Sequence, residues 1–463
     1  MKVVFRLCSM IIAAAFAATP ASSQTTPAQI QTQAEAALVA GNPAQTVALA
    51  NQLLETNPNS FAALFLLAVA QSDLEQHRDA AASAARAYSA ARSESTRLQA
   101  ARLAATAHFR ANQFSRSELW FRRAANHIET EEEAEAIVRG FQRAQSANPI
   151  TTQYTASIAP SDNINNGSDA SRLCFESLDG TCFLELDLRE DQLSLSGLEY
   201  NGSARLQYRL GQDDRQQTNV GVLFFGQGVV FSEETRDQLA GSESETVREL
   251  DESDFSAFLT ELSIEQRQTR LSPFGPTRLA FNSGKYWRAG DLLVNYQDMI
   301  FAQQIPLEPN ASVLLEGSVR KQQAVAPGLL DSTIYELSAG YSTRRDNRDV
   351  AAFTLAGKYN KSGEESTFEE YRVRMDYTYA QTFVQTRWST FTEIGYRSFD
   401  EFSSTFDGRR DWFVNSGVTG VFEEIAYFGF SPSISLFGTR TDSDVSFIDS
   451  SKISLSFGIA SNF

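Results

Sequence analysis

Two cysteines, Cys174 and Cys182, are the residues of this 463-residue chain whose spacing most directly suggests chemistry. The segment between them contains Asp179-Gly180, a pair typical of tight turns, which would bring the two thiols together. In an oxidising compartment a lone close pair of cysteines most simply forms a disulfide. A metal site is disfavoured because two cysteines leave half of the ligands missing. The sequence therefore predicts a Cys174–Cys182 disulfide.

The other residues that could do chemistry do not form a catalytic constellation. The three histidines are spread along the first third of the chain without ligand spacing, which favours solvated or packed side chains: His77, His108 and His127. The run Asp162-Asn163-x-Asn165 with Asp169 resembles a calcium loop, but it lacks the closing glutamate, and Asx-rich turns explain it better. With no nucleophile motif and no phosphate loop, we expect no enzyme, cofactor or metal.

The first residues indicate the compartment. Lys2 and Arg6 precede a short apolar stretch over 7–18, and Ala21-Ser22-Ser23 offers small residues for cleavage. This pattern is typical of a secretory signal and is too short for a spanning helix. We expect a signal peptide over 1–23 and a mature chain from Gln24. Cys8 then belongs to the removed peptide.

Composition narrows the class of protein. The net charge of -17 argues against nucleic-acid binding, which needs basic surfaces. The mean hydropathy of -0.28 excludes a bundle of membrane helices. It does not exclude a membrane β-barrel, in which alternating apolar and polar residues cancel in the average.

Residues 24–149 have a helix-forming composition and repeat. Alanine, glutamine, leucine and glutamate dominate between Pro27 and Pro149, and glycine occurs only at 41 and 140. Helices are expected over 42–54, over 78–91 and from 116 onward. Their spacing, measured at Ala44, Ala80 and Ser117, is close to the 34-residue period of tetratricopeptide repeats. The alternative is an unrelated helical bundle.

The repeat pattern is strongest in the third unit. Ser117, Phe121 and Ala124 match a small-x3-Phe-x2-small pattern that lets two helices approach closely, whereas the first unit departs from it with Asn51 at the third place. The second unit keeps only the small residues: Ala80, Ala84 and Ala87. Stacked helix pairs form an extended concave surface, so this domain is expected to dock a partner chain.

After Pro149 the period changes to two. Apolar and polar residues alternate, with arginines and acids on the polar face, as in a sheet between lipid and a watery lumen. Fourteen runs, each about 9–11 residues or more, are long enough to cross a bilayer when tilted. They lie near 151–159, 201–211, 218–231, 255–267, 277–287, 294–306, 311–321, 333–342, 349–360, 370–380, 387–398, 410–422, 426–439 and 452–463. Twelve or sixteen strands stay open as alternatives.

The connections agree with a barrel over 150–463. If the repeats are periplasmic, every second connection should be a short turn. Such turns fall at 213–215, 307–310, 344–348 and 423–424, whereas 160–200 and 232–254 are long. The apolar stretch 183–188 is expected to be loop structure inside the first long connection.

The last run carries the expected assembly signal. Phe457 and Ile459 share the lipid-facing parity with the terminal aromatic Phe463. An alternating strand that ends in an aromatic residue is what the barrel assembly machinery reads. In a closed antiparallel barrel every backbone N–H and C=O group has a hydrogen-bond partner, as lipid requires. A soluble β-sandwich is under no such requirement.

Two segments resemble a known family. One is the first-strand exit, Ala156 to Asn166, with Pro160, Ser161, Asp162, Asn163 and Asn165; the other is the C-terminal hairpin from Ser435 to Phe463. With the overall architecture, these segments resemble the surface lipoprotein assembly modulators, known as Slam proteins. The resemblance implies periplasmic tetratricopeptide repeats, a fourteen-stranded outer-membrane barrel, and delivery of lipoproteins or related secreted proteins to the cell surface. About three repeats is short for that family, which leaves the client open.

Two other functions compete with a protein translocator. An outer-membrane export porin for a polysaccharide also carries periplasmic repeats, although usually in longer arrays. An outer-membrane lipase or protease is disfavoured because the barrel region has no histidine and no paired nucleophile. The identity of a neighbouring gene would separate the first two.

Overall fold

The computed structural model describes residues 26–176, 182–272, 275–402, 408–422 and 430–461. The chain divides into two compact units, 1–145 and 146–463. The signal peptide expected over 1–23 lies outside the described residues. None of the described helices is long and apolar enough to span a membrane.

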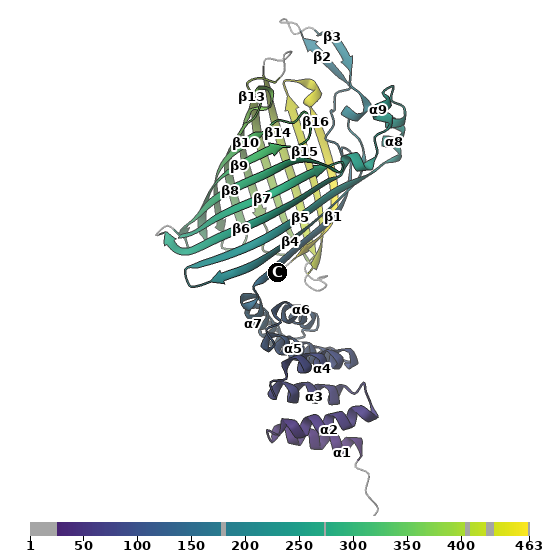
Figure 1. The fold of residues 1–463 in the computed structure, drawn as a ribbon, viewed down its shortest axis with the longest axis vertical. Helices are drawn as coiled ribbons and strands as arrows, with labels where there is room; N and C mark the ends of the chain where they lie inside the picture. Colours follow the sequence, from purple (N-terminus) through teal and green to yellow (C-terminus); the bar gives the residue numbers. More distant parts are fainter. Residues whose placement is uncertain (1–25, 177–181, 273–274, 403–407, 423–429, 462–463) are drawn as a thin grey trace, which may run out of the picture. The chain divides into compact units, whose positions relative to one another are not determined.

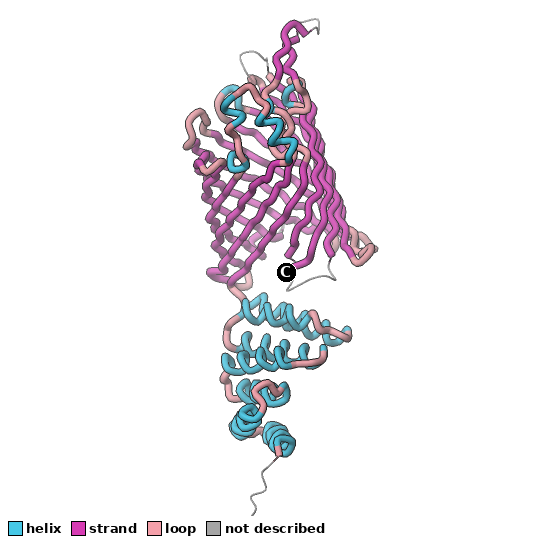
Figure 2. The backbone as a smooth tube through the Cα atoms, turned by 90° about the vertical axis from the view of Figure 1, so that its right-hand side faces the viewer, coloured by secondary structure: helices cyan, strands magenta, loops and turns pink. Residues whose placement is uncertain are grey.

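The first unit consists of helix pairs (Figures 1 and 2). Its helices are α1 (Pro27–Val39), α2 (Pro43–Thr56), α3 (Phe61–Asp73), α4 (His77–Ala90), α5 (Glu94–Arg110), α6 (Phe114–Ala125) and α7 (Glu131–Ala147). The three predicted helices are α2, α4 and α6, the second members of three pairs. Each pair turns at one residue with a left-handed backbone: Gly41, Glu75 and Asn112. The same turn thus recurs after 34 and 37 residues, which confirms tetratricopeptide-like repeats.

Buried small residues bring the paired helices together. Thr46, Ala80 and Ser117 occupy equivalent places and are fully buried. The Ser117 hydroxyl donates to the carbonyl oxygen of Ala105 at 2.8 Å, across the pair α5–α6. The predicted alignment of the first unit is wrong, because Ala44 and Asn51 are exposed. Its buried positions start two residues later and include Leu53 at the third place.

The second unit is a closed antiparallel barrel of fourteen strands among the described residues (Figure 1). The strands are β1 (Ile150–Ser161), β4 (Gly197–Gln212), β5 (Gln216–Phe231), β6 (Ala257–Ser272), β7 (Gly275–Arg288), β8 (Asp291–Glu308), β9 (Ala311–Ala324), β10 (Ser332–Arg344), β11 (Val350–Lys361), β12 (Phe368–Thr378), β13 (Thr386–Phe399), β14 (Arg409–Phe422), β15 (Phe430–Ser443) and β16 (Ser450–Ser461). Each predicted run coincides with one strand. Residues 426–429 of the thirteenth run lie outside the described residues.

The barrel has an entry end, where β1 begins after α7, and a far end, where β1 finishes. Short turns at 213–215, 309–310 and 345–349 lie at the entry end, as predicted, and the turn predicted at 423–424 lies outside the described residues. The predicted alternation of lengths is wrong at two places. The far-end turn 289–290 has two residues, and the entry-end connection 379–385 has seven.

The two long far-end connections form a small folded cap. The cap contains α8 (Glu233–Ala240), α9 (Glu245–Arg248) and the separate two-stranded sheet of β2 (Arg172–Glu176) and β3 (Cys182–Asp187). The apolar stretch 183–188 lies in the first long connection, but the expectation of loop structure there is wrong, because strand β3 covers residues 182–187. Buried apolar side chains join both connections to β5: Ile164, Leu195, Val229, Phe231, Leu239 and Val247.

The start of the barrel unit includes the end of α7. The Arg209 guanidinium of β4 donates to the carbonyl oxygens of Ser146 at 2.7 Å and Asn148 at 2.8 Å. Ser146 belongs to the barrel unit, and these bonds join it to β4 within that unit.

Candidate functional site: the lumen wall and the barrel seam

The two faces of the barrel wall differ as the alternation predicted. On β10, Leu337 is 72 % exposed and Tyr335 and Tyr341 are also exposed on the outer face, whereas Glu336 and Ser338 alternate with them. The same pattern on neighbouring strands gives an apolar outer band and a charged inner face, which is the arrangement of an outer-membrane-type barrel.

Inward charges pair across an intervening strand. The Arg278 guanidinium of β7 contacts the Glu316 carboxylate of β9 at 2.7 Å. Between them on β8 lies Ala302, the register partner of both residues. Because alanine leaves room above the sheet, the two long side chains meet over it. Arg278 also lies 3.5 Å from Glu265 of β6.

At Gly284, too, a small residue on the middle strand lets side chains of the two flanking strands meet. This β7 residue is the register partner of Glu261 on β6 and of Tyr296 on β8. A Cβ atom at Gly284 would lie 2.3 Å from the Tyr296 ring. Glycine therefore lets the Tyr296 hydroxyl donate to the Glu261 carboxylate at 2.9 Å.

Strands β12 to β14 carry arginines stacked on aromatic rings. Arg374 lies 4.2 Å from the Phe391 ring centroid, and Arg409 lies 4.0 Å from that of Phe399. Arg374 also pairs with Asp376 at 2.8 Å, and Arg409 pairs with Asp411 at 2.9 Å. The wall is therefore polar, and these charges are neutralised by partners within the chain.

The seam between β1 and β16 has the shortest ladder in the described barrel. It has four paired positions, from Ala156 with Ile459 to Ser161 with Ser454, whereas every other neighbouring pair of strands has at least ten. Pro160 interrupts the ladder because proline has no N–H to donate. The predicted assembly residues Phe457 and Ile459 lie at this seam, on its exposed outer face. Phe463 lies outside the described residues.

Side chains of the junction motif replace the missing ladder. The Asp162 carboxylate accepts the Ile453 N–H at 2.9 Å, and the Asn163 amide donates to the Ser451 carbonyl oxygen at 2.9 Å. The Ser454 hydroxyl donates to the Pro160 carbonyl oxygen at 3.3 Å. We call Pro160, Ser161, Asp162 and Asn163 the seam clasp, because their contacts join the first strand to the last.

Asn165 serves the cap rather than the seam. Its amide donates to the carbonyl oxygens of Asp191 at 3.0 Å and Leu193 at 2.7 Å, and its oxygen accepts the Leu195 N–H at 3.0 Å. The predicted local Asx turn is present, because the Asn165 oxygen also accepts the Gly167 N–H at 3.3 Å. The bonds to 191–195 are long-range and were not predicted. Among the described residues there is no group of three His, Cys, Asp or Glu side chains that could hold a metal.

Glu190 joins the two long connections that form the cap. The Ser242 hydroxyl donates to the Glu190 carboxylate, and this bond lowers the pKa of Glu190 below its ordinary value. The Gln238 amide donates to the Glu190 carbonyl oxygen at 3.0 Å. No sequence pattern predicted the cap or the clasp; the Asx-rich run marked the place without showing which strand it would reach.

The predicted Cys174–Cys182 disulfide does not fit the backbone register of the hairpin β2–β3. The backbone register pairs Cys174 with Glu185 and Cys182 with Glu176, so the cysteines are not directly opposite. Their side chains lie outside the described residues. A disulfide needs Cα atoms about 4.4–6.8 Å apart. The bond stays a prediction, and it requires this hairpin to shift its register.

The histidines occupy separate places in the repeats. His127 contacts the Glu94 carboxylate and lies 2.8 Å from the Tyr88 hydroxyl, and the bond to His127 lowers the pKa of Glu94. His108 is buried at 2.8 Å from the Gln113 side-chain oxygen, and burial lowers its pKa. His77 is on the first turn of α4.

No family model matches the chain, and no characterised protein matches it by sequence. Among solved structures, the repeats are similar to the TPR2B domain of yeast Sti1 in complex with pHsp70, with 13 % identity over 26 % of this chain and 98 % of that chain and a TM-score of 0.25. They are also similar to the Yersinia enterocolitica type III secretion chaperone SycD in complex with a peptide of the translocator YopD. The identity is 11 %, the match covers 26 % of this chain and 92 % of that chain, and the TM-score is 0.24. The barrel is similar to Acinetobacter baumannii OccAB4, with 8 % identity over 68 % of this chain and 99 % of that chain and a TM-score of 0.34. The assignment of both folds rests on the helix pairs and the closed strand order.

Proposed function

We propose that the protein is an outer-membrane translocator that delivers surface lipoproteins or related secreted proteins, with the repeats docking the client in the periplasm. The observation that carries this proposal is the joining, on one chain, of tetratricopeptide-like repeats to a closed barrel with a polar inner face. Stacked helix pairs suit the binding of an extended segment, and a polar lumen suits its passage.

The resemblance to the surface lipoprotein assembly modulators belongs to this proposal. The fourteen-stranded barrel and the structured junction motif support it. Barrel assembly machinery is the expected partner for insertion. The ion pairs described in the lumen join residues of this chain to one another, so they favour no particular client.

Orientation can be tested with protease. In intact cells, cleavage should be confined to the far-end cap, and the repeats should become sensitive only when the outer membrane is permeabilised. Repeats that are cleaved in intact cells would reverse the proposed orientation.

Client delivery can be tested in a strain that lacks the gene. The chain is co-expressed with the lipoprotein encoded beside it, and surface exposure of that lipoprotein is measured by antibody binding to intact cells. Delivery should depend on the chain, and a photo-crosslinker placed at the exposed Val138 of α7 should capture the same client. Surface exposure that is equal with and without the chain would refute the proposal. Loss of a surface polysaccharide alone would instead support the export porin.

A further inference from the structure

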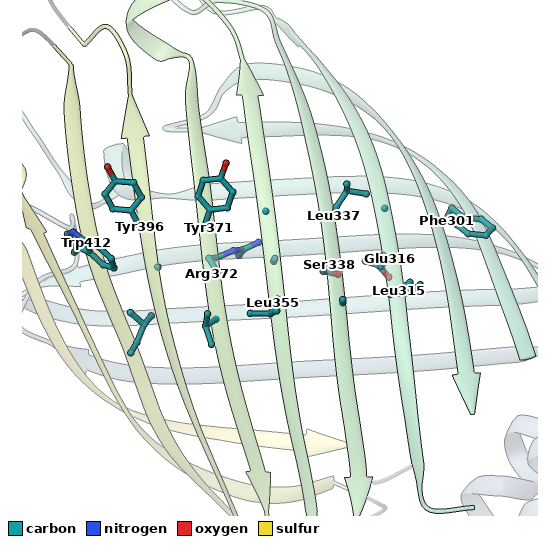
Figure 3. Close-up of a pocket in the computed structure, with 17 residues that line it drawn as sticks. Phe301, Leu315, Glu316, Leu337, Ser338, Leu355, Tyr371, Arg372, Tyr396 and Trp412 are labelled. Atoms are coloured by element: carbon teal, nitrogen blue, oxygen red, sulfur yellow. The ribbon is translucent and has the colours of Figure 1, made fainter. Parts of the chain in front are cut away.

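The outer wall of the barrel contains a hollow that the translocator function does not use. It covers about 890 Å³ over strands β8 to β14 (Figure 3). The outer band of a barrel normally presents a continuous layer of side chains to lipid. A hollow in this band therefore needs a specific cause in the sequence.

Glycine and alanine create the hollow. One register row crosses seven strands through Phe301, Gly317, Leu337, Gly357, Tyr371, Tyr396 and Trp412. The two glycines flank Leu337, which is 72 % exposed. Its side chain leans over Gly317, where a Cβ atom would lie 3.1 Å from Leu337 Cδ2, so the open gap lies over Gly357. In the next row, Ala339 lies between Leu315 and Leu355 and extends the gap. Large aromatic side chains close both sides of this small-residue floor.

The position of the hollow defines the chemistry that can enter it. Its exposed rim is apolar, with Phe301 53 %, Tyr371 56 % and Trp412 59 % exposed. The row lies within the lipid-facing band, where hydrocarbon replaces water as solvent. Water-soluble ligands are excluded there, and a flexible hydrocarbon chain fits a narrow gap beside a projecting leucine.

One end of the hollow is polar. The Tyr371 hydroxyl donates to the Glu369 carboxylate at 3.0 Å, and Tyr396 packs on Trp412 with ring centroids 4.9 Å apart. Figure 3 shows the hydroxyls of Tyr371 and Tyr396 pointing the same way. This direction is toward the far end, because Glu369, which accepts from Tyr371, lies nearer the far-end start of β12. Tyrosine and tryptophan favour the membrane–water interface, so head groups belong at this end.

We propose that this hollow binds one acyl chain of a membrane lipid, from the leaflet that meets the far end of the barrel. The head group lies at the rim made by Tyr371 and Tyr396. The chain lies over Ala339 and Gly357 and packs against Leu337.

The test uses the full chain in lipid nanodiscs that contain a phospholipid with a photoactivatable acyl chain. Gly357→Leu fills the hollow, since a Cβ atom there would lie 3.7 Å from the nearest atom of Tyr371. Gly226→Leu is the matched control on the outer face of β5, where the nearest atom is 3.9 Å away on Phe258. Both sites have room for a side chain, and the heat-modifiable mobility of each variant verifies that it has folded.

We expect peptides of β9 to β12 to be labelled several-fold more than the remaining outer wall. Gly357→Leu should reduce that labelling to the average of the wall, and Gly226→Leu should leave it unchanged. Even labelling around the wild-type barrel, or an unchanged pattern in Gly357→Leu, would overturn the proposal. A Leu337→Cys variant that forms disulfide-linked dimers and shows no lipid labelling would assign the hollow to a second copy of the chain. That result would also overturn the proposal.

Discussion

Replacing Asn163 with alanine should loosen the barrel seam selectively. The Asn163 side chain is 1 % exposed and makes three hydrogen bonds. Its amide donates to Gly167 and Ser451 carbonyl oxygens, both at 2.9 Å, and its oxygen accepts the Gly167 N–H at 2.7 Å. The bond to Ser451 crosses the seam directly, and the two bonds to Gly167 hold the loop in the conformation that the crossing needs.

The expected effect follows from these three bonds. Each neutral hydrogen bond contributes about 1 kcal/mol net, and buried partners left unsatisfied add to the loss. The free energy of seam opening should therefore fall by about 3 kcal/mol, or roughly 100-fold in the opening equilibrium, since about 1.4 kcal/mol corresponds to a factor of ten. Opening frees the amides of β16 from the clasp, starting with Ile453.

Hydrogen exchange measured by mass spectrometry on the full chain in nanodiscs tests this prediction. Amides of β16 between Lys452 and Ser456 should exchange roughly 100-fold faster in Asn163→Ala, in line with the lost hydrogen bonds. Asn165→Ala is the matched control, because it loses bonds to 191–195 and a longer one to the Gly167 N–H at 3.3 Å, and none of those described reaches β16. Unchanged exchange in β16 of Asn163→Ala, or equal acceleration in both variants, would refute the role assigned to the clasp.

Three other predictions rest on the structure, and a fourth tests the disulfide expected from the sequence. Burial lowers the pKa of His108 below its ordinary value of 6.5, so the unfolded chain accepts a proton more readily than the folded repeats do. The stability of the repeats against urea should therefore decrease as pH falls below about 6.5. His108→Asn should remove this dependence. Phe121→Ala should destabilise the repeats by about 3–5 kcal/mol, measured as the loss of helical circular dichroism in urea, whereas a small effect would mean that the cavity collapses. Ala302→Leu should separate the charged pair that meets over it and slow barrel folding into vesicles, so an unchanged folding rate would contradict the spacer role. Peptide mapping without reductant should find Cys174 linked to Cys182, and two free thiols in protein taken from the cell envelope would exclude the disulfide.

The sequence by itself determined the two fold classes. A helix and a strand bury one face with periods of 3.6 and 2, so their patterns are local and can be read without neighbours. This is why the fourteen runs coincide with barrel strands and why the second helices of the repeats were found. The first repeat was misaligned by two residues because Thr46, rather than Ala44, has its side chain at the helix contact.

The tertiary structure decided what the polar residues do. Hydrogen-bond partners such as Asn163 and Ser451 are 288 positions apart, and no local period relates them. The small residues Ala302 and Gly284 gain their role from the register of three strands, which places charged or polar side chains on either side of them. The outer hollow likewise exists only because the register aligns Gly317, Leu337 and Gly357 in one row. Periodicity assigns a residue to a face, but only pairing between strands determines which residues share that face.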